Sequence, residues 1–314
     1  MTVSKTIVAK TGSLIISGFE GTSISSELKN LILDQRIGGF VLFERNYESP
    51  SQLHALIQEM QSMAISQTDG QPLLISVDQE GGRVSRLKAP FSAFPPQKQL
   101  GLARSEELAY RFGQSLAVEL KSVGINMDFA PILDVNSNMH NPIIGERAIS
   151  GDPKLVSFLS AAIIRGFLST GVLPVGKHFP GHGDTDRDSH LELPKVNKSA
   201  KNLEDIELKP FIYNIERGLQ VIMTGHVLYP AWDKDYPATF SKKILFGILR
   251  KKLKFKGLII SDDLEMKAIE NFFEFKDIPS LGFKAGLDQF MICNNLEKTI
   301  LLQEQMIQDT EKGK

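Results

Sequence analysis

Eight short apolar runs, separated by segments with helical periodicity, recur along the 314-residue chain. Near-continuous apolar runs of strand length are typical of parallel strands that are buried on both faces. Strands that alternate with helices predict an α/β fold, and eight such units in a chain of this length match a (β/α)8 (TIM) barrel. A doubly wound sheet stays open as an alternative, because periodicity cannot show that a sheet closes. The runs cover residues 13–19, 38–43, 72–78, 125–131, 173–179, 221–226, 257–263 and 286–294.

The intervening segments carry recognisable helix boundaries. Ser105 and Asp152 precede amphipathic stretches as expected of N-caps, and Gly124 and Gly171 follow them as expected of C-terminal stops. No linker or compositional break interrupts the alternation, so we expect a single domain over residues 1–314. The chain stops soon after the eighth run, which predicts a short last helix. The expected helices cover 49–65, 105–124, 152–171, 199–218 and 241–253.

Composition excludes several classes of protein. The formal charge of −1 gives no basic surface for nucleic acid and no reason to expect an anionic membrane as partner. Cys293 is the only cysteine, so no intramolecular disulfide can form, which fits a reducing compartment. The N-terminal residues lack the pattern of a signal peptide, and no apolar run approaches the length of a membrane span. We therefore expect a soluble, cytoplasmic protein that is a monomer.

Polar side chains stand where five of the apolar runs end. A charged group near the end of a buried strand is costly unless it is paired or used. The carboxyl ends of the strands of a parallel barrel share one face, which holds the active site. Five strands ending in this way therefore predict one shared pocket. These residues are Asp78, Asp128, Lys177 with His178, His226, and Asp262 with Asp263.

The segment VDQEGGRVSRL follows the third run and surrounds a Gly81–Gly82 turn with charged residues. It does not match a phosphate-binding loop. Asp78 with Arg86 suits a ligand rich in hydroxyl groups, because a carboxylate accepts and a guanidinium donates hydrogen bonds. For Arg83, an ion pair with an aspartate that braces the loop is an equally good reading. In NPIIGERAISGDP, beyond the fourth run, Arg147 is the residue best able to reach a ligand.

The segment LIISDDLEM places two adjacent carboxylates at the end of a strand. Neighbouring strand residues point to opposite faces, so only one should enter the pocket. That carboxylate is a candidate nucleophile or stabiliser of developing positive charge. The other suits a cap for the chain that follows.

The segment KHFPGHGDTDRDSH, residues 177–190, is rich in histidine and aspartate. A zinc or iron site is possible, although its glycines and proline exclude a helical pair of ligands. Proton transfer is the favoured alternative. Asp188 stands two residues before His190, and a carboxylate bonded to one ring nitrogen raises the basicity of the other. His182 lies between the two halves of the segment, and we expect it only to organise the loop.

These motifs, with NMDFAPILDVN, occur in an order that resembles glycoside hydrolase family 3, in particular its β-N-acetylglucosaminidases, over residues 14–300. The resemblance implies a retaining hydrolase on a (β/α)8 barrel, with no metal or cofactor. It implies that Asp262 is the nucleophile and that His190, oriented by Asp188, is the acid/base. It also implies that the terminal N-acetylglucosamine is held by Asp78, Arg86, Arg147, Lys177 and His178. Bacterial cytoplasmic members remove this sugar from peptidoglycan fragments during cell-wall recycling.

One departure is the sequence ERAIS, which stands where many members have a Ser-Phe pair after the arginine. Several alternatives to an N-acetylglucosaminidase remain open from the sequence. They are a β-glucosidase or β-xylosidase of the same family, phosphorolysis in place of hydrolysis, a metal-dependent hydrolase on the same fold, and a sugar-binding module without activity.

Overall fold

The computed structural model describes residues 4–66, 71–185 and 193–313, and within them eight parallel strands close into a barrel. Pairing of the first strand with the last, Ile15 beside Phe290 and Ser17 beside Ile292, completes the circle. The predicted barrel is confirmed, and closure excludes the doubly wound sheet. The strands, in their order around the barrel, are β1 (Ile15–Ser17), β2 (Gly39–Leu42), β3 (Leu74–Val77), β6 (Met127–Asp128), β7 (Leu173–Phe179), β8 (Val221–Thr224), β9 (Leu258–Asp263) and β10 (Gln289–Ile292).

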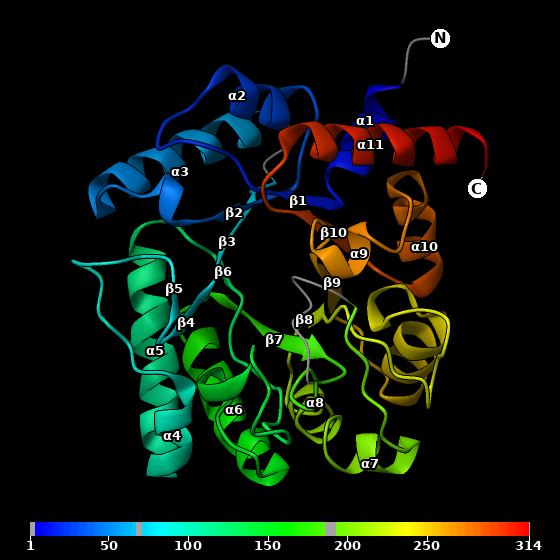
Figure 1. The fold of residues 1–314 in the computed structure, drawn as a ribbon. Coiled ribbons are helices and arrows are strands. Elements are labelled where there is room, and N and C mark those ends of the chain that lie inside the picture. Colours follow the sequence, from blue (N-terminus) through cyan, green and yellow to red (C-terminus); the bar gives the residue numbers. More distant parts are fainter. Residues whose placement is uncertain (1–3, 67–70, 186–192, 314) are drawn as a thin grey trace.

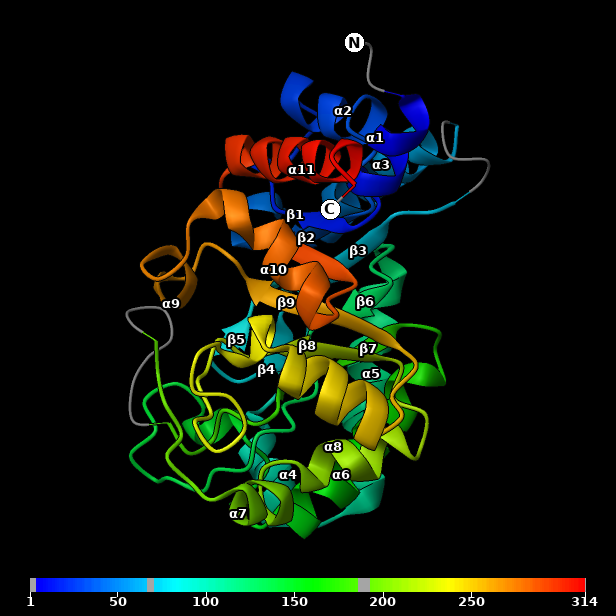
Figure 2. The same ribbon diagram turned by 90° about the vertical axis from the view of Figure 1, so that its right-hand side faces the viewer.

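Helices surround the strands, and the first and last of them lie side by side (Figures 1 and 2). A small antiparallel hairpin of β4 (Gln79–Gly81) and β5 (Val84–Ser85) follows β3. None of the helices in the described part of the chain is long and apolar enough to span a bilayer. The helices are α1 (Lys5–Gly12), α2 (Ser26–Leu33), α3 (Pro50–Ile65), α4 (Gln97–Ala103), α5 (Glu106–Ser122), α6 (Pro153–Leu168), α7 (Ala200–Asp205), α8 (Lys209–Ile215), η4 (Lys243–Lys252), α9 (Lys267–Glu270), α10 (Ile278–Ala285) and α11 (Leu296–Glu311), with short 3-10 turns η1 (Glu44–Asn46), η2 (Gly145–Arg147), η3 (Ala238–Phe240) and η5 (Phe275–Asp277).

Helix boundaries agree with the sequence in some places and differ in others. Ser105 and Asp152 are N-caps whose side chains accept backbone hydrogen bonds, as predicted. The single helix predicted over 199–218 is wrong, because Pro210 lacks the amide hydrogen that a continuous helix needs, and two helices form instead. The last helix, α11, is 16 residues long rather than short. The predicted helix over 241–253 forms as η4, which is wound as a π-helix.

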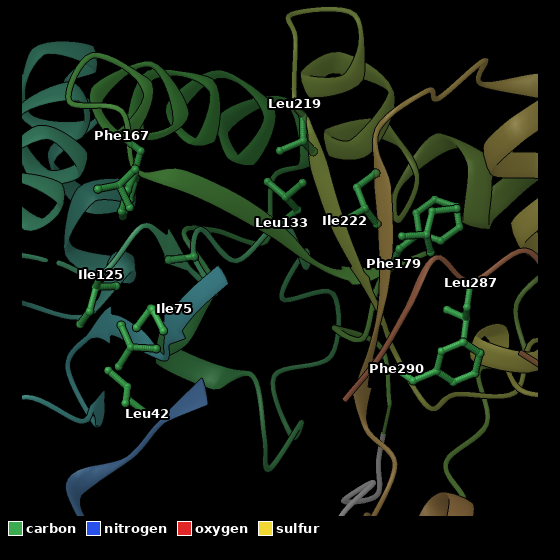
Figure 3. Close-up of a cluster of buried hydrophobic side chains, with 14 of the residues drawn as sticks. Leu42, Ile75, Ile125, Leu133, Phe167, Phe179, Leu219, Ile222, Leu287 and Phe290 are labelled. Atoms are coloured by element: carbon green, nitrogen blue, oxygen red, sulfur yellow. The ribbon is translucent and has the colours of Figure 1, made fainter. Parts of the chain in front are cut away.

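Two apolar layers hold the barrel together. The inner layer fills its interior with side chains that include Val41, Met127, Val175 and Ile260. The outer layer packs the strands against the helices, and Figure 3 shows part of it, including Leu133, Leu219 and Phe290. Because the interior is filled, a ligand can reach the strands only at their ends.

Helices α5 and α6 approach each other unusually closely through a glycine on each. A Cβ added at Gly113 would lie 2.3 Å from the carbonyl oxygen of Ile163, and one at Gly166 would lie 2.3 Å from that of Tyr110. Real Cβ atoms essentially never come so near to backbone atoms. The absence of side chains therefore sets the distance between these two helices.

We predict that Gly166→Ala lowers the free energy of unfolding by about 1–3 kcal/mol, because the methyl group overpacks the contact with α5. Alanine is otherwise favoured over glycine in a helix by about 1 kcal/mol, so propensity alone predicts the opposite sign. Gly247→Ala in η4 is the matched control, since the nearest atom to its new Cβ would be 3.8 Å away. Guanidinium unfolding of both variants measures the effect, and equal stability of the two would contradict this packing argument.

Candidate active site

A cavity of about 300 Å3 opens at the carboxyl ends of the strands. Six of the eight site residues predicted from the sequence line it. The other two, Asp188 and His190, lie outside the described residues. The six are Asp78, Arg86, Arg147, Lys177, His178 and Asp262. The strand-end pattern correctly brings together Asp78, Lys177, His178 and the two aspartates of β9. It is wrong for Asp128 and His226, which are fully buried and do not line the cavity.

A buried carboxylate that the sequence analysis left without a role, Glu80, organises two of the predicted residues. It is 1% exposed. Arg147 grips it with two hydrogen bonds, from Nε to Oε2 at 2.9 Å and from Nη2 to Oε1 at 2.7 Å. The Nζ atom of Lys177 lies 2.7 Å from the same Oε1 and 2.5 Å from Oδ1 of Asp78. Glu80 is thus the shared partner of both buried cations, on a β-hairpin that the GG turn allows.

The charges in this cluster stabilise one another. Burial alone would raise the pKa of Glu80, but Arg147 and Lys177 outweigh it and hold that pKa far below its usual range. Burial would lower the pKa of Lys177, and the carboxylates of Asp78 and Glu80 raise it instead. Glu80 is therefore an anion, and Lys177 a cation, at any physiological pH.

The arginines of the GG turn have different partners. Arg83 donates to the carbonyl of Ile143, in the loop after β6. Among the described residues it makes no ion pair with an aspartate, which was one of the two alternatives for this arginine. Arg86 is the arginine near Asp78, with Nη2 and Oδ2 3.8 Å apart. Gly81 and Gly82 both have positive φ, 88° and 61°, as a turn that needs glycine requires.

A second residue without a predicted role, Asp134, holds the chain that carries His178. Its Oδ1 accepts hydrogen bonds from the backbone N–H groups of His178 at 3.1 Å and His182 at 2.6 Å. Its Oδ2 lies 2.7 Å from Nδ1 of His178. Burial raises the pKa of Asp134, but the two histidines offset this and leave it lowered. The anionic carboxylate makes Nδ1 of His178 a donor and fixes the orientation of its ring, which lines the cavity.

The two adjacent aspartates at the end of β9 have pKa values that are shifted in opposite directions. Burial raises the pKa of Asp262, but His178, His226 and the amide of Asp263 outweigh it, so the net shift is downward. Burial also raises the pKa of Asp263, and the net shift brings this pKa to about 7. Lys177 also lowers the pKa of Asp262, but by less than the two histidines.

Both aspartates line the cavity, so the prediction that only one would do so is wrong. The reason is a register shift, in which Ile260 and Asp263 of β9 pair with Gln289 and Met291 of β10. Three residues along β9 therefore match two residues along β10, which is a β-bulge. The bulge interrupts the alternation of side chains between the two faces of the strand. The predicted capping role of Asp263 agrees with its contacts, because its Oδ1 accepts from the amide of Glu265 at 3.0 Å.

The other two histidines near the site, His182 and His226, make hydrogen bonds that hold the surrounding chain. Burial and the field of His178 lower the pKa of His182 to about 4. Its Nδ1 lies 2.9 Å from the hydroxyl of Thr185, which fits the predicted loop-organising role, although His182 also lines the cavity. His226 bonds through Nε2 to the carbonyl oxygen of Asp263 at 2.9 Å. No group of three or more His, Cys, Asp or Glu residues in the described ranges is arranged to hold a metal ion.

We predict that Glu80→Gln lowers the free energy of unfolding at pH 7 by about 3–5 kcal/mol, because it leaves two buried cations short of an anion. The folded-state pKa of Glu80 is depressed. Its contribution is therefore complete above its unfolded pKa of about 4.3 and is lost as the pH falls toward the folded value. The difference in free energy of unfolding between wild type and variant should decrease by about 1.4 kcal/mol for each pH unit below about 4.3. Guanidinium unfolding between pH 7 and pH 3 measures it, and a constant difference would refute the assignment.

Comparison with known protein sequences identifies the family of this chain. Residues 6–314 match the glycosyl hydrolase family 3 N terminal domain. A beta-hexosaminidase from Nitrosomonas eutropha is 39% identical over 281 residues, which cover 88% of this chain and 79% of the relative. A beta-hexosaminidase from Tolumonas auensis is 40% identical over 279 residues, which cover 88% of this chain and 81% of that protein.

Solved structures extend the comparison to three dimensions. A family 3 beta-N-acetylglucosaminidase from Paenibacillus superposes with a TM-score of 0.96 at 39% identity, over 99% of this chain and 59% of that chain. NagZ from Neisseria gonorrhoeae, in complex with N-trifluoroacetyl-D-glucosamine, gives a TM-score of 0.84 at 33% identity, over 95% and 88% of the two chains. The same NagZ is also known in complex with zinc ion. This chain therefore belongs to glycosyl hydrolase family 3 and is a glycoside hydrolase.

Proposed function

We propose that the protein is a retaining exo-β-N-acetylglucosaminidase that removes the terminal, non-reducing sugar by double displacement. The observation that carries this proposal is the position of Asp262 at the end of β9, in a small cavity shared with Lys177, His178 and Asp78, where its pKa is lowered. A cavity of about 300 Å3 is at the small end of ligand pockets, which suits one sugar unit. The beta-hexosaminidase relatives and the glucosamine derivative bound to NagZ support the choice of sugar.

We assign sugar binding to Asp78, Arg86, Arg147, Lys177 and His178. Lys177 has three donor hydrogens, and Asp78 and Glu80 occupy two directions, which leaves one for a sugar hydroxyl. Asp78 keeps Oδ2 as an acceptor beside Arg86. Glu80 already occupies Nε and Nη2 of Arg147, so that residue acts mainly through its positive charge.

In the first chemical step, the carboxylate of Asp262 attacks the anomeric carbon as the bond to the leaving oxygen breaks. The product is a covalent glycosyl-enzyme, and attack by water on it restores Asp262 with net retention of configuration. The neighbouring histidines favour ionised Asp262 before the attack. Asp263, with a pKa of about 7, is a weaker candidate nucleophile because it is protonated more readily.

We assign proton transfer to His190 and the orientation of its ring to Asp188. His190 would give a proton to the leaving oxygen in the first step and take one from the attacking water in the second. Both residues lie outside the described residues, but the stem of their segment is well anchored. Tyr229 donates to the carbonyl of Gly181 at 2.6 Å, and Asn141 donates to the carbonyl of His182 at 2.9 Å.

We further propose that the substrates are peptidoglycan fragments and that the enzyme acts in the cytoplasm as a monomer, with residues 1–314 as a single domain. The resemblance to β-N-acetylglucosaminidases of cell-wall recycling and the NagZ neighbours support this assignment. Hydrolysis of purified fragments with a terminal N-acetylglucosamine, followed by chromatography of the released sugar, tests it.

We predict that Asp262→Asn lowers kcat on an aryl β-N-acetylglucosaminide by at least about 1,000-fold, because the neutral amide cannot form the covalent intermediate. Asp263→Asn is the matched control, since its amide oxygen can still accept from Glu265 and Cys293. It should keep kcat within about tenfold of wild type. Assays with and without a chelator separate this mechanism from a metal-dependent one. Full activity of Asp262→Asn, or loss of wild-type activity to the chelator, would rule out the proposal.

We predict that His190→Ala acts selectively on substrates with poor leaving groups. Loss of a general acid costs about 10²–10⁴-fold in rate when the departing oxygen needs a proton. A dinitrophenyl leaving group needs none, so its glycosylation rate should fall far less. Steady-state and burst kinetics on methylumbelliferyl and dinitrophenyl glycosides measure the difference. Equal losses on both substrates would argue that His190 is not the acid.

A further inference from the structure

A second cavity, of about 440 Å3, lies in the outer layer of the barrel between η4 and α10. None of its lining residues is shared with the active-site cavity. Figure 2 shows η4 (yellow) beside α10 (orange) on the face toward the viewer. The buried side chains of Phe240 and Ala285 line it together with the exposed ring of Phe246. It is an apolar groove that the reaction proposed above does not use.

The winding of η4 determines which side chains border this groove. In an α-helix, Lys242 and Lys251 would lie about 180° apart around the axis, on opposite faces. A π-helix makes i→i+5 hydrogen bonds with about 4.4 residues per turn, which brings the same two residues within about 20° of each other. Phe246 and Gly247 then fall on that face as well, and all four residues line the groove. A π-helix of ten residues is rare, and π turns occur frequently at functional sites.

The result is an aromatic ring flanked by two ammonium groups. The Nζ atoms of Lys242 and Lys251 lie 5.9 and 4.9 Å from the centre of the Phe246 ring. Among the residues that the structure describes, neither lysine has a carboxylate within ion-pair distance, and the same holds for Lys284 on α10.

The charge around the groove is positive overall. Four lysines line it, against two aspartates. One of these, Asp233, already accepts from Ser241 at 2.7 Å and pairs with Lys243 at 3.4 Å. A buried apolar surface beneath a rim of excess positive charge is complementary to a ligand with an apolar body and one negative group.

We propose that this groove is a binding site for a small amphipathic anion, namely an aryl or medium-chain acyl carboxylate or sulfonate. Its apolar body would lie against Phe240 and Phe246, and its anionic group would lie between Lys242 and Lys251. The volume is within the range of small-molecule sites and is too small for a folded partner to enter.

The test uses the whole chain and two probes, the fluorescent aromatic monoanion 8-anilinonaphthalene-1-sulfonate and decanoate. Two variants alter the groove. Gly247→Leu fills it from a position where a new Cβ meets only one atom, at 3.8 Å. Lys242→Glu with Lys251→Glu reverses the charge of the rim. Lys29→Glu, an exposed lysine on α2, is the matched control for charge reversal. Circular dichroism and the midpoint of guanidinium unfolding verify that each variant is folded.

We expect one probe molecule per chain, displaced by decanoate but not by decanol. Both groove variants should lower the affinity for the probe at least about tenfold, and Lys29→Glu should leave that affinity unchanged within about twofold. Absence of binding, equal binding by the groove variants and wild type, or equal displacement by decanol would each overturn the proposal. If Gly247→Leu and the double lysine variant cannot fold, Lys251→Gln replaces them, because it removes one charge without adding another. It should still lower the affinity for the probe, and an unchanged affinity would overturn the proposal.

Discussion

The ion cluster around Glu80 is the interaction on which the geometry of the site depends. Glu80 comes from the hairpin after β3, Lys177 from β7, and Arg147 from the turn after β6, so one carboxylate fixes three separate units of the barrel. Two cations and two carboxylates that are this closely paired are stable when buried, whereas any one of them alone would be costly. The cluster also determines which atoms remain for a ligand. Asp78 and Lys177, which lie 2.5 Å apart, line the cavity and keep further hydrogen-bonding capacity, whereas Glu80 is buried and does not line it.

The sequence predicts the barrel well because its signals are local. Each strand is a short apolar run, and Ser105 and Asp152 mark their helices through hydrogen bonds that span only a few residues. The strand-end rule then locates Asp78, Lys177, His178 and Asp262 in one cavity, and the loop motifs add Arg86 and Arg147. Glu80 and Asp134 could not be assigned in this way, because their partners lie 67 and 44 residues away. Their position inside the quoted motifs was the only signal. The bulge in β9 and the π winding of η4 also depend on packing against neighbouring elements, which periodicity does not report.

The bulge bears directly on chemistry, because it brings two adjacent carboxylates to one cavity and their environments then separate their pKa values. His178 and His226 beside Asp262 lower its pKa, whereas burial and the neighbouring carboxylates of Asp262 and Glu265 raise the pKa of Asp263. Two like charges this close resist simultaneous ionisation. A downward pKa shift in one and an upward shift in the other is the arrangement that lets one carboxylate act as nucleophile while its neighbour holds the backbone.

Asp134 connects this electrostatic arrangement with the segment that carries the proposed acid/base. The same carboxylate fixes the ring of His178 beside Asp262 and the backbone of His182 at the stem of that segment. Gly183 shows how tightly the stem is packed, since a Cβ there would lie 1.6 Å from the carbonyl oxygen of Val135. A retaining hydrolase needs a fixed nucleophile and a proton donor that serves two different steps. One buried anion therefore holds the sugar-binding end of β7 and the stem at His182 in a common frame.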